Sequence, residues 1–218
     1  VPRVTAAELQ KINGVVSSFS GSYVNNATGR VNNMKIATNS VNGTLLMPGE
    51  EFSYNKAIGE TTPENGYQQA GAYVAGEVVQ EYGGGVCNIS TILYRAAMRA
   101  NLKSSLRYNH SMMVSYAEPS LDATVYEGEI DYRFVNTYDF PIYIEGYMTS
   151  NTIVFNIYGN KESFGNNTYE LVNEVIEKLD YTTEYVNDNT LAEGSRVTTV
   201  NGMAGYRSKA YLVTYSNG

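Results

Sequence analysis

The sequence is poor in cysteine, histidine and tryptophan, and each shortage excludes a class of site. Its 218 residues include one Cys, one His and no Trp. A single cysteine excludes an internal disulfide and any zinc site built from several cysteines. One thiol and one imidazole give no cluster of metal ligands, so we expect neither a metal nor another cofactor.

Positive charge is also scarce. The chain has 15 Lys and Arg against 22 Asp and Glu, a net charge of -7, which argues against nucleic acid or an anionic membrane surface as a partner. No apolar run reaches the roughly 18 residues of a membrane-spanning helix. Because the chain begins Val1-Pro2-Arg3 rather than with Met, we expect a longer precursor. Any export signal or membrane anchor would lie outside these residues. We expect the protein to be a monomer.

The composition and the pattern of the N-terminal half predict a folded protein that begins with helices. Hydrophobic residues make up 43% and charged residues 17%, as in globular domains. Thr5 and Glu8 predict a capping box for a helix that continues to Phe19. After a break at Asn25-Asn26, a second helix is predicted over 29–41.

The C-terminal half changes to the period of two that is typical of strands. Before this change of period, a loop-like stretch is expected over 52–76 and a helix after Gly85. Strands are then predicted over 106–116, 123–126, 130–135, 142–147 and 153–158, and after a linker at 161–168 over 169–177, 195–200 and 209–215. The predicted class is α+β, with N-terminal helices and a Cys-bearing helix packed on an antiparallel sheet, followed by a small all-β segment. We divide the chain into a domain over 1–160 and a linker with a β segment over 161–218.

The most informative segment is Gly83-Gly84-Gly85-Val86-Cys87. Glycines allow sharp turns and close approach of a ligand to the backbone. At a helix start the partial positive charge stabilises a thiolate, and the unpaired N–H groups of the first turn can bind an oxyanion. Cys87 therefore fits a nucleophile for acyl transfer. The alternative is that Cys87 is buried and fills a small apolar space.

His110 is the only histidine and therefore the candidate base. A third group should orient its ring, and we favour Asp122 over Asp131 and Glu60 because Asp122 is expected at the head of a neighbouring strand. Arg107 and Arg95 are candidates for binding a substrate carboxylate, or are simply solvated.

These residues resemble the VanW-like family over about residues 30–159. The matching elements are Pro48-Gly49-Glu50-Glu51-Phe52-Ser53-Tyr54-Asn55, Gly66-Tyr67 with Ala70, Gly83-Gly84-Gly85-Val86-Cys87 with Ser90-Thr91 and Leu93-Tyr94, Arg107 with His110-Ser111, and Asp122-Ala123-Thr124-Val125. Two positions depart from the family: Asn88 stands where Gln is usual, and Ser120 where Gly is usual. More loosely, residues 170–218 resemble part of a G5-type β module.

The resemblance implies an extracytoplasmic enzyme of Gram-positive cell walls, an L,D-transpeptidase that forms 3–3 cross-links between peptidoglycan stem peptides. Cys87 would be the nucleophile and His110 the base, while the role of Asp122 is our own assignment. Expected substrate-binding residues are Gly84, Gly85, Asn88, Ser90, Thr91, Tyr94 and Arg107. Two alternatives remain open: an L,D-carboxypeptidase or endopeptidase acting through the same thioester, and a non-catalytic wall-binding module.

Overall fold

The computed structural model describes residues 4–24, 27–74 and 77–218, and its fold is α+β, as predicted. The helices are α1 (Ala6–Leu9), α2 (Thr28–Val41), α3 (Tyr54–Ile58), the 3₁₀ helix η1 (Pro63–Asn65), α4 (Val86–Arg99) and α5 (Lys161–Phe164). The strands are β1 (Gly14–Ser22), β2 (Thr44–Leu46), β3 (Glu51–Ser53), β4 (Gln69–Val74), β5 (Glu77–Tyr82), β6 (Lys103–Leu106), β7 (Arg133–Val135), β8 (Ile142–Met148), β9 (Thr152–Gly159), β10 (Thr168–Leu179) and β11 (Gly205–Tyr215).

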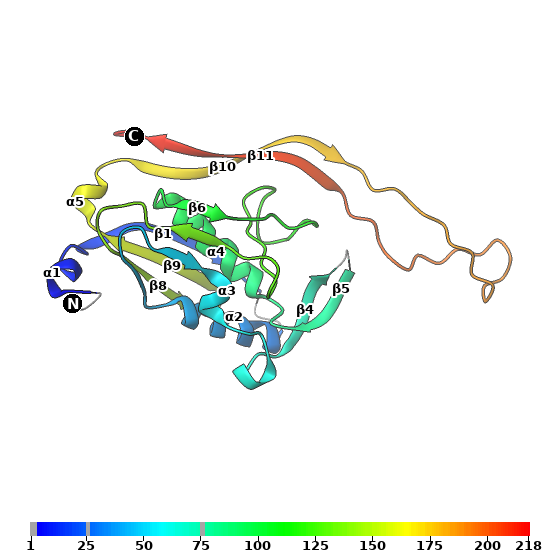
Figure 1. Ribbon diagram of the computed structural model, residues 1–218. Helices are drawn as coiled ribbons and strands as arrows, with labels where there is room; N and C mark the ends of the chain where they lie inside the picture. The colour runs from blue at the N-terminus through cyan, green and yellow to red at the C-terminus, as the bar shows by residue number, and fades with distance from the viewer. Residues whose placement is uncertain (1–3, 25–26, 75–76) are drawn as a thin grey trace.

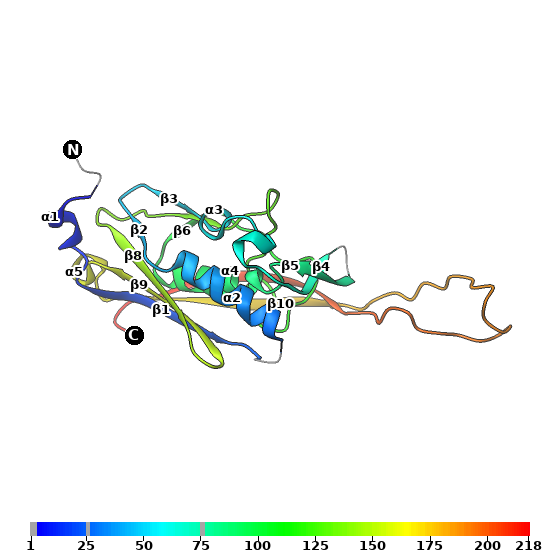
Figure 2. The ribbon, with the colours of Figure 1, turned by 90° about the horizontal axis from the view of Figure 1, so that it is seen from below.

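An antiparallel sheet with the strand order β1-β9-β8-β2 carries the core. Burial alternates along β9, so that Ile153, Phe155 and Ile157 are fully buried and the residues between them are half-exposed. This alternation is expected of a sheet with one face on the core and one toward water. Helices α2 and α4 contact the same sheet, α4 against β1 and β9 and α2 against β8 (Figures 1 and 2).

Helix α4 is the central element of the core. Ile89, Leu93 and Ala96 are completely buried, in agreement with the apolar face predicted from their spacing. The hydroxyl of Ser17 on β1 donates to the carbonyl of Ala96 at 2.8 Å, which ties the sheet to the helix. The position of Cys87 is therefore fixed by one of the best-packed elements of the molecule.

Two smaller sheets lie beside this core. The first has the order β3-β7-β6, and the second is the hairpin of β4 and β5. Figure 1 shows that hairpin extending from the body of the molecule, with β5 leading directly into the glycine turn and α4. A loop was predicted over 52–76, but the described part of that stretch contains regular elements, including α3 and β4.

The predicted first helix is correct only at its start. Thr5 and Glu8 do form the capping box, but α1 ends at Leu9. The following residues form β1, which pairs with β9 along its whole length. The second predicted helix matches α2 within one residue at its N-terminus.

Other expectations need correction as well. The stretch 107–116, predicted as strand, is almost entirely loop, with an isolated bridge between Tyr108 and Thr124. Residues 195–200 form no strand, and the predicted linker contains α5. The strands predicted near 142–147, 153–158, 169–177 and 209–215 are present as β8, β9, β10 and β11. The break at Asn25-Asn26 and the loop end at Gly76 lie outside the described residues.

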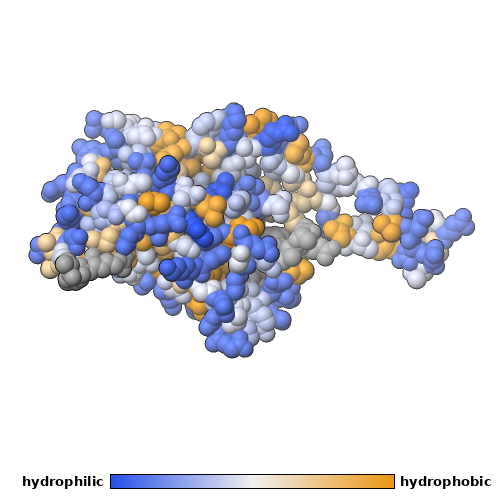
Figure 3. Space-filling model, viewed as in Figure 1, coloured by the Kyte–Doolittle hydropathy of each residue, from blue (hydrophilic) through white to orange (hydrophobic). Residues whose placement is uncertain are grey.

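Strands β10 and β11 form a long antiparallel hairpin that runs along the body of the molecule (Figure 1). Its root belongs to the core, because Leu171 is 4% exposed within the main hydrophobic cluster and Glu170 lies 3.8 Å from Arg99 of α4. Beyond β10 the chain continues without regular structure to β11, and it exposes Val186 at 83%. Figure 3 shows this part as a projection with mixed hydrophilic and hydrophobic residues. None of the helices in the described ranges is both long and apolar enough to cross a bilayer.

Candidate active site

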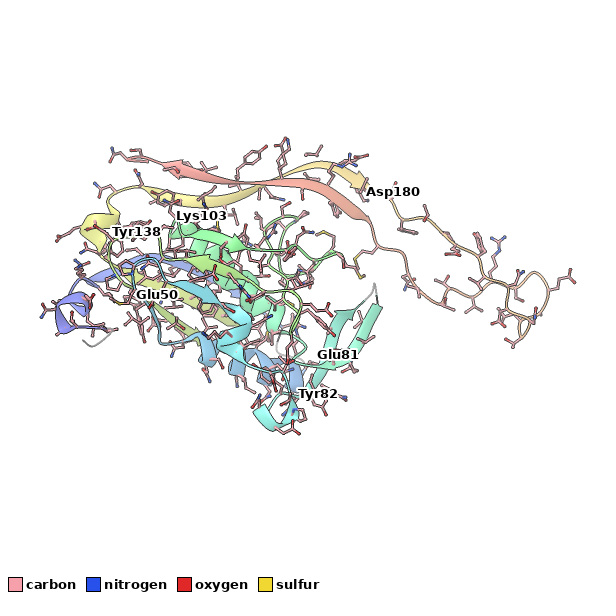
Figure 4. The ribbon with its side chains drawn as sticks, viewed as in Figure 1. Glu50, Glu81, Tyr82, Lys103, Tyr138 and Asp180 are labelled. Carbon is pink, nitrogen blue, oxygen red and sulfur yellow. The ribbon has the colours of Figure 1, made fainter. Side chains whose placement is uncertain are left out.

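A cavity of about 1130 Å³ opens over the start of α4. Its walls are the hairpin of β4 and β5, the glycine turn, the loop that carries His110, and the segment 124–130. Cys87, His110 and Tyr116 all line it. In Figure 4, Glu81 and Tyr82 mark the end of β5, where this wall leads into the glycine turn. The cavity thus lies over Cys87 and His110, the candidate nucleophile and base, and it is large enough for a peptide segment.

The backbone conformation and close packing of the glycine turn, Gly83-Gly84-Gly85, require glycine at these positions. Gly83 and Gly85 have φ of +83° and +112°, a region that favours glycine. Gly84 packs so closely on β4 that a Cβ atom there would lie 2.5 Å from the carbonyl oxygen of Ala70. The turn positions Cys87 in the first turn of α4, as predicted.

Replacing Gly84 with alanine is therefore expected to lower the free energy of unfolding by at least about 2 kcal/mol, because the contact involves backbone that cannot move aside. Thermal or denaturant unfolding measures this loss. Gly71 on β4 is the matched control: a Cβ there meets nothing closer than 3.4 Å, so its alanine variant should remain close to the parent protein. Equal stability of the two variants would contradict this account of the turn.

The Cys87 thiol is half-buried at the cavity wall. Its sulfur donates to the carbonyl of Val125 at 3.3 Å and lies 3.8 Å from the hydroxyl of Thr124. Burial raises the pKa of Cys87, but a hydrogen bond from His110 and the positive charge of that ring more than reverse this effect, so that the pKa lies below its ordinary value. This favours the nucleophilic form of the sulfur.

His110 lies in the loop after the bridge at Tyr108, not on the predicted strand. Its Nδ1 atom is 2.6 Å from Oδ2 of Asp122, and its Nε2 atom is 3.2 Å from the hydroxyl of Tyr116. Burial lowers the pKa of His110, but hydrogen bonds to Asp122 and to the sulfur of Cys87 raise it to about 9. At neutral pH the ring is therefore an imidazolium beside the thiol.

Asp122 is held at the back of this ring. Its carboxylate also accepts from the backbone N–H of His110 at 2.6 Å and from Nη2 of Arg107 at 3.1 Å. Burial raises the pKa of Asp122, but the two hydrogen bonds from His110 more than offset this, and the pKa lies below its usual range. The structure thus brings together Cys87, His110 and Asp122, with the carboxylate oriented toward the imidazole as in catalytic triads.

Arg107 was expected to bind a substrate carboxylate, but its contacts lie within the protein. Besides the Asp122 carboxylate, it donates to the carbonyls of Asp122 at 2.7 Å and Ser120 at 2.9 Å. Its guanidinium also lies 5.2 Å from the ring centroid of Tyr94, which is buried. Arg107 and Tyr94 do not line the cavity; together they hold the segment that carries Asp122.

Ser90 and Thr91 are also buried, away from the cavity. The hydroxyl of Ser90 donates to the carbonyl of Ala123 at 2.7 Å, and Thr91 Oγ1 accepts from the N–H of Ala123 at 3.1 Å. Asn88 is buried against α2, with its amide nitrogen 3.9 Å from the sulfur of Met34. Of the expected substrate contacts, Gly84 and Gly85 line the cavity, whereas these three side chains join α4 to its neighbours.

The alternative candidates are placed elsewhere. Asp131 accepts from Ser53 and pairs with Arg133 at 2.7 Å, and Glu60 is exposed. Arg95 pairs with Glu118 at 2.9 Å.

Three cavity residues were not identified from the sequence as candidates. Thr124 lies next to the sulfur and was present only as part of a quoted motif. Tyr116, which contacts the His110 ring, is one of 20 tyrosines and carried no distinguishing signal. Arg30 of α2 lines the cavity, and nothing in its surrounding sequence indicates a site.

The C-terminal hairpin reaches the outer side of the His110 loop. A second cavity of about 450 Å³ lies between them, lined by residues that include Asp122 and Arg207. The hydroxyl groups of Ser120 and Ser208 form a hydrogen bond across this contact. Ser120 has φ of +70°, a backbone conformation that favours glycine.

Comparison with known proteins identifies two families in the chain. Residues 29–158 match the family described as VanW like protein, and residues 170–218 match the G5 domain. The chain is 34% identical over 131 residues to the uncharacterized protein YoaR of Bacillus subtilis (strain 168), which covers 60% of this chain and 43% of YoaR. It is 27% identical over 139 residues to the vancomycin B-type resistance protein VanW of Enterococcus faecalis (strain ATCC 700802 / V583), covering 61% and 50%.

The aligned regions span about half of these relatives or less, and no solved structure matches the chain. Both resemblances inferred from the sequence are confirmed, because each corresponds to a matched family. The VanW-like match covers more than half of the 218 residues. The protein therefore belongs to the VanW-like family.

Proposed function

We propose that this protein is a cysteine-dependent L,D-transpeptidase that acts on peptidoglycan stem peptides outside the cytoplasm of a Gram-positive bacterium. The supporting observation is the arrangement of Cys87, His110 and Asp122: a thiol with a lowered pKa and an imidazolium at the wall of one cavity, with an orienting carboxylate behind the imidazolium ring. The G5 match and the resistance protein among its relatives support a function at the cell wall.

The acylation step follows from these groups. The Cys87 thiolate attacks the carbonyl carbon of the L-centred third residue of a tetrapeptide stem, forming the C–S bond. As the C–N bond breaks, the imidazolium of His110 gives its proton to the departing amine of the terminal D-Ala. A thioester and a neutral imidazole remain, and Asp122 keeps the ring oriented for the second step.

In the second step, a side-chain amine of a neighbouring stem attacks the thioester carbon. The amine gives a proton to His110, the C–S bond breaks, and the Cys87 thiolate and the imidazolium are restored. The product contains a 3–3 peptide bond. If water attacks the thioester instead of the amine, the protein acts as an L,D-carboxypeptidase. If the attacked peptide bond is internal, hydrolysis of the thioester makes it an endopeptidase.

Donors for the tetrahedral oxyanion are limited by the first turn of α4. The N–H groups of Val86 and Asn88 already donate to the carbonyls of Gly83 at 3.1 Å and Gly85 at 3.0 Å. We therefore assign the oxyanion to the N–H of Cys87 itself, at the positive end of the helix. The buried side chain of Asn88 takes no part in this step.

Mass spectrometry of a reaction with purified tetrapeptide muropeptides tests the proposal. The intact protein should gain the mass of the tetrapeptide minus D-Ala, and the products should include cross-linked dimers. Free tripeptide without dimers would assign the carboxypeptidase alternative. Binding of the muropeptide with neither adduct nor product would indicate the non-catalytic wall-binding module.

The activity should depend on pH through both partners of the ion pair. Acylation needs thiolate, which forms as the pH rises through the lowered pKa of Cys87, and imidazolium, which is lost as the pH rises through about 9. We expect a bell-shaped pH profile of kcat/KM for D-Ala release, with an alkaline limb near pH 9. A rate that continues to rise beyond that limb would argue against proton donation by His110.

A further inference from the structure

Arg30 is a cation in the cavity wall that the chemistry above does not use. It is the third residue of α2, half-buried, and it lines the same cavity as Cys87. Its aliphatic part packs on the N-cap of α4: a Cβ atom on Gly85 would lie 2.9 Å from Cγ of Arg30. Gly85 precedes Cys87 by two residues, so the Arg30 side chain begins beside the turn that presents the nucleophile.

The Arg30 guanidinium is weakly engaged by the protein. Its Nη1 atom lies 3.4 Å from the carbonyl oxygen of Gly71, near the outer limit for a hydrogen bond. Among the residues that the structure describes, no carboxylate forms an ion pair with it. In contrast, Arg107 pairs with Asp122, and Arg95 with Glu118. The two arginines that the sequence suggested for a substrate carboxylate are thus paired with carboxylates of the protein, whereas Arg30 has no carboxylate partner in the described part of the chain.

The charges around the cavity leave Arg30 in a distinct position. Of the described residues that line it, Arg30 and His110 carry the positive charges. The acidic residues in the lining are Glu81, Glu127 and Glu129, and the carboxylate of Glu127 is engaged by Thr61 at 2.8 Å. Because the positive charge of His110 is paired with the Cys87 thiolate, Arg30 is the cation that can bind an anionic group of a ligand lying near Cys87.

We propose that Arg30 binds the free α-carboxylate of the C-terminal residue that leaves during acylation. This inference rests on the proposed function and specifies its substrate. The carboxylate belongs to the residue directly after the attacked carbonyl, and consecutive Cα atoms are about 3.8 Å apart, a span that suits a guanidinium based beside Gly85. A planar guanidinium binds a carboxylate through two parallel hydrogen bonds. The enzyme would then select stems with a free terminus and reject bonds inside a cross-link.

The test compares two tetrapeptides, one ending in a carboxylate and one in a carboxamide, on the parent protein and on Arg30→Gln. With the parent protein, the carboxamide should raise KM by about 10- to 100-fold, the effect of one charge-assisted contact. In Arg30→Gln, the carboxylate peptide should suffer the same loss and the carboxamide almost none. Arg30→Lys should retain part of the selectivity. Lys35→Gln removes one charge from an exposed position of the same helix and should behave like the parent protein.

Binding measurements separate this inference from the reaction itself. Fluorescence polarisation of a labelled tetrapeptide on the Cys87→Ala protein, with and without Arg30→Gln, reports the contact without turnover. The subsite is supported if Arg30→Gln weakens the binding of the carboxylate peptide but not that of the carboxamide peptide. This result would hold even if the parent protein never releases D-Ala and the proposed reaction fails. Equal binding of both peptides by both proteins overturns it. If Arg30→Gln does not fold, Arg30→Lys and the two peptides on the Cys87→Ala protein decide in the same way.

Discussion

Replacing Cys87 with alanine is expected to reduce D-Ala release from a tetrapeptide stem to background, a loss of at least about 10⁴-fold. No other cysteine exists in the chain to take over the attack. Without the sulfur no thioester can form, so that neither step of the cycle can proceed. The Cys87→Ser variant should be nearly as inactive, because a hydroxyl at this position ionises far less readily than a thiol.

The fold should tolerate both Cys87 substitutions. Besides its interaction with His110, the sulfur donates a hydrogen bond at 3.3 Å and makes a longer contact at 3.8 Å, so its loss removes little packing. Thermal unfolding and the binding of labelled tetrapeptide are the controls for an intact site. Undiminished cross-linking by the alanine variant, in a protein that unfolds at the same temperature, would refute the proposed nucleophile.

Replacing Asp122 with asparagine is expected to impair both catalysis and stability. The amide cannot hold the His110 ring as the carboxylate does, so kcat should fall roughly 10²- to 10⁴-fold. Arg107 then lies beside an uncharged amide, and breaking a largely buried ion pair in this way typically destabilises a protein by about 3–5 kcal/mol. Steady-state kinetics and denaturant unfolding measure the two effects separately.

The pH dependence of stability should change in the same variant. The pKa of His110 is raised to about 9 in the folded protein, above about 6.5 for an unfolded chain. Its protonation therefore stabilises the fold below about pH 6.5, and this contribution is lost as the pH rises through about 9. Without the Asp122 carboxylate the folded pKa falls, and the alkaline loss of stability and of activity should both move to lower pH.

Asp131 offers a matched control for Asp122. Both carboxylates are 5% exposed, and both pair with an arginine. Asp131 accepts hydrogen bonds from Ser53, Asn55 and Arg133, whereas Asp122 is the carboxylate that contacts His110. Asp131→Asn should therefore destabilise the protein without shifting the pH profile of catalysis. A shift of equal size in both variants would mean that Asp122 affects the rate only through the fold.

The fold was predictable where one periodicity dominates. The spacing of apolar residues after Gly85 matches the buried face of α4, and alternation identified β8 and β9. The first helix was overextended for a physical reason. Strand β1 contains a bulge between Val15 and Ser17, which interrupts alternation and makes its apolar residues mimic helical spacing. Its pairing with β9, a contact distant in sequence, determines the strand.

The residues of the candidate site could be proposed from the sequence where their types are rare. Cys87 and His110 are unique in the chain, and Asp122 followed from the need to orient an imidazole. The contacts of Arg107 within the protein could not be predicted, because its partners lie on a loop whose path no periodicity encodes. Arg30 could not be identified as a candidate for a similar reason: helix α2 meets the glycine turn through tertiary contacts, which include the packing of Gly85 and a hydrogen bond from Asn33 to the carbonyl of Gly84.

The burial of Leu171 separates the limits of the sequence families from the limits of the core. The VanW-like match ends at residue 158, yet Leu171 contributes to the same hydrophobic cluster, and Phe164 between them packs against Tyr138. A shortened chain that ended at residue 158 would lack the side chains of Phe164 and Leu171, which cover this end of the core. Apolar core residues would then be exposed to water. The smallest soluble version of the protein must therefore retain at least the beginning of β10.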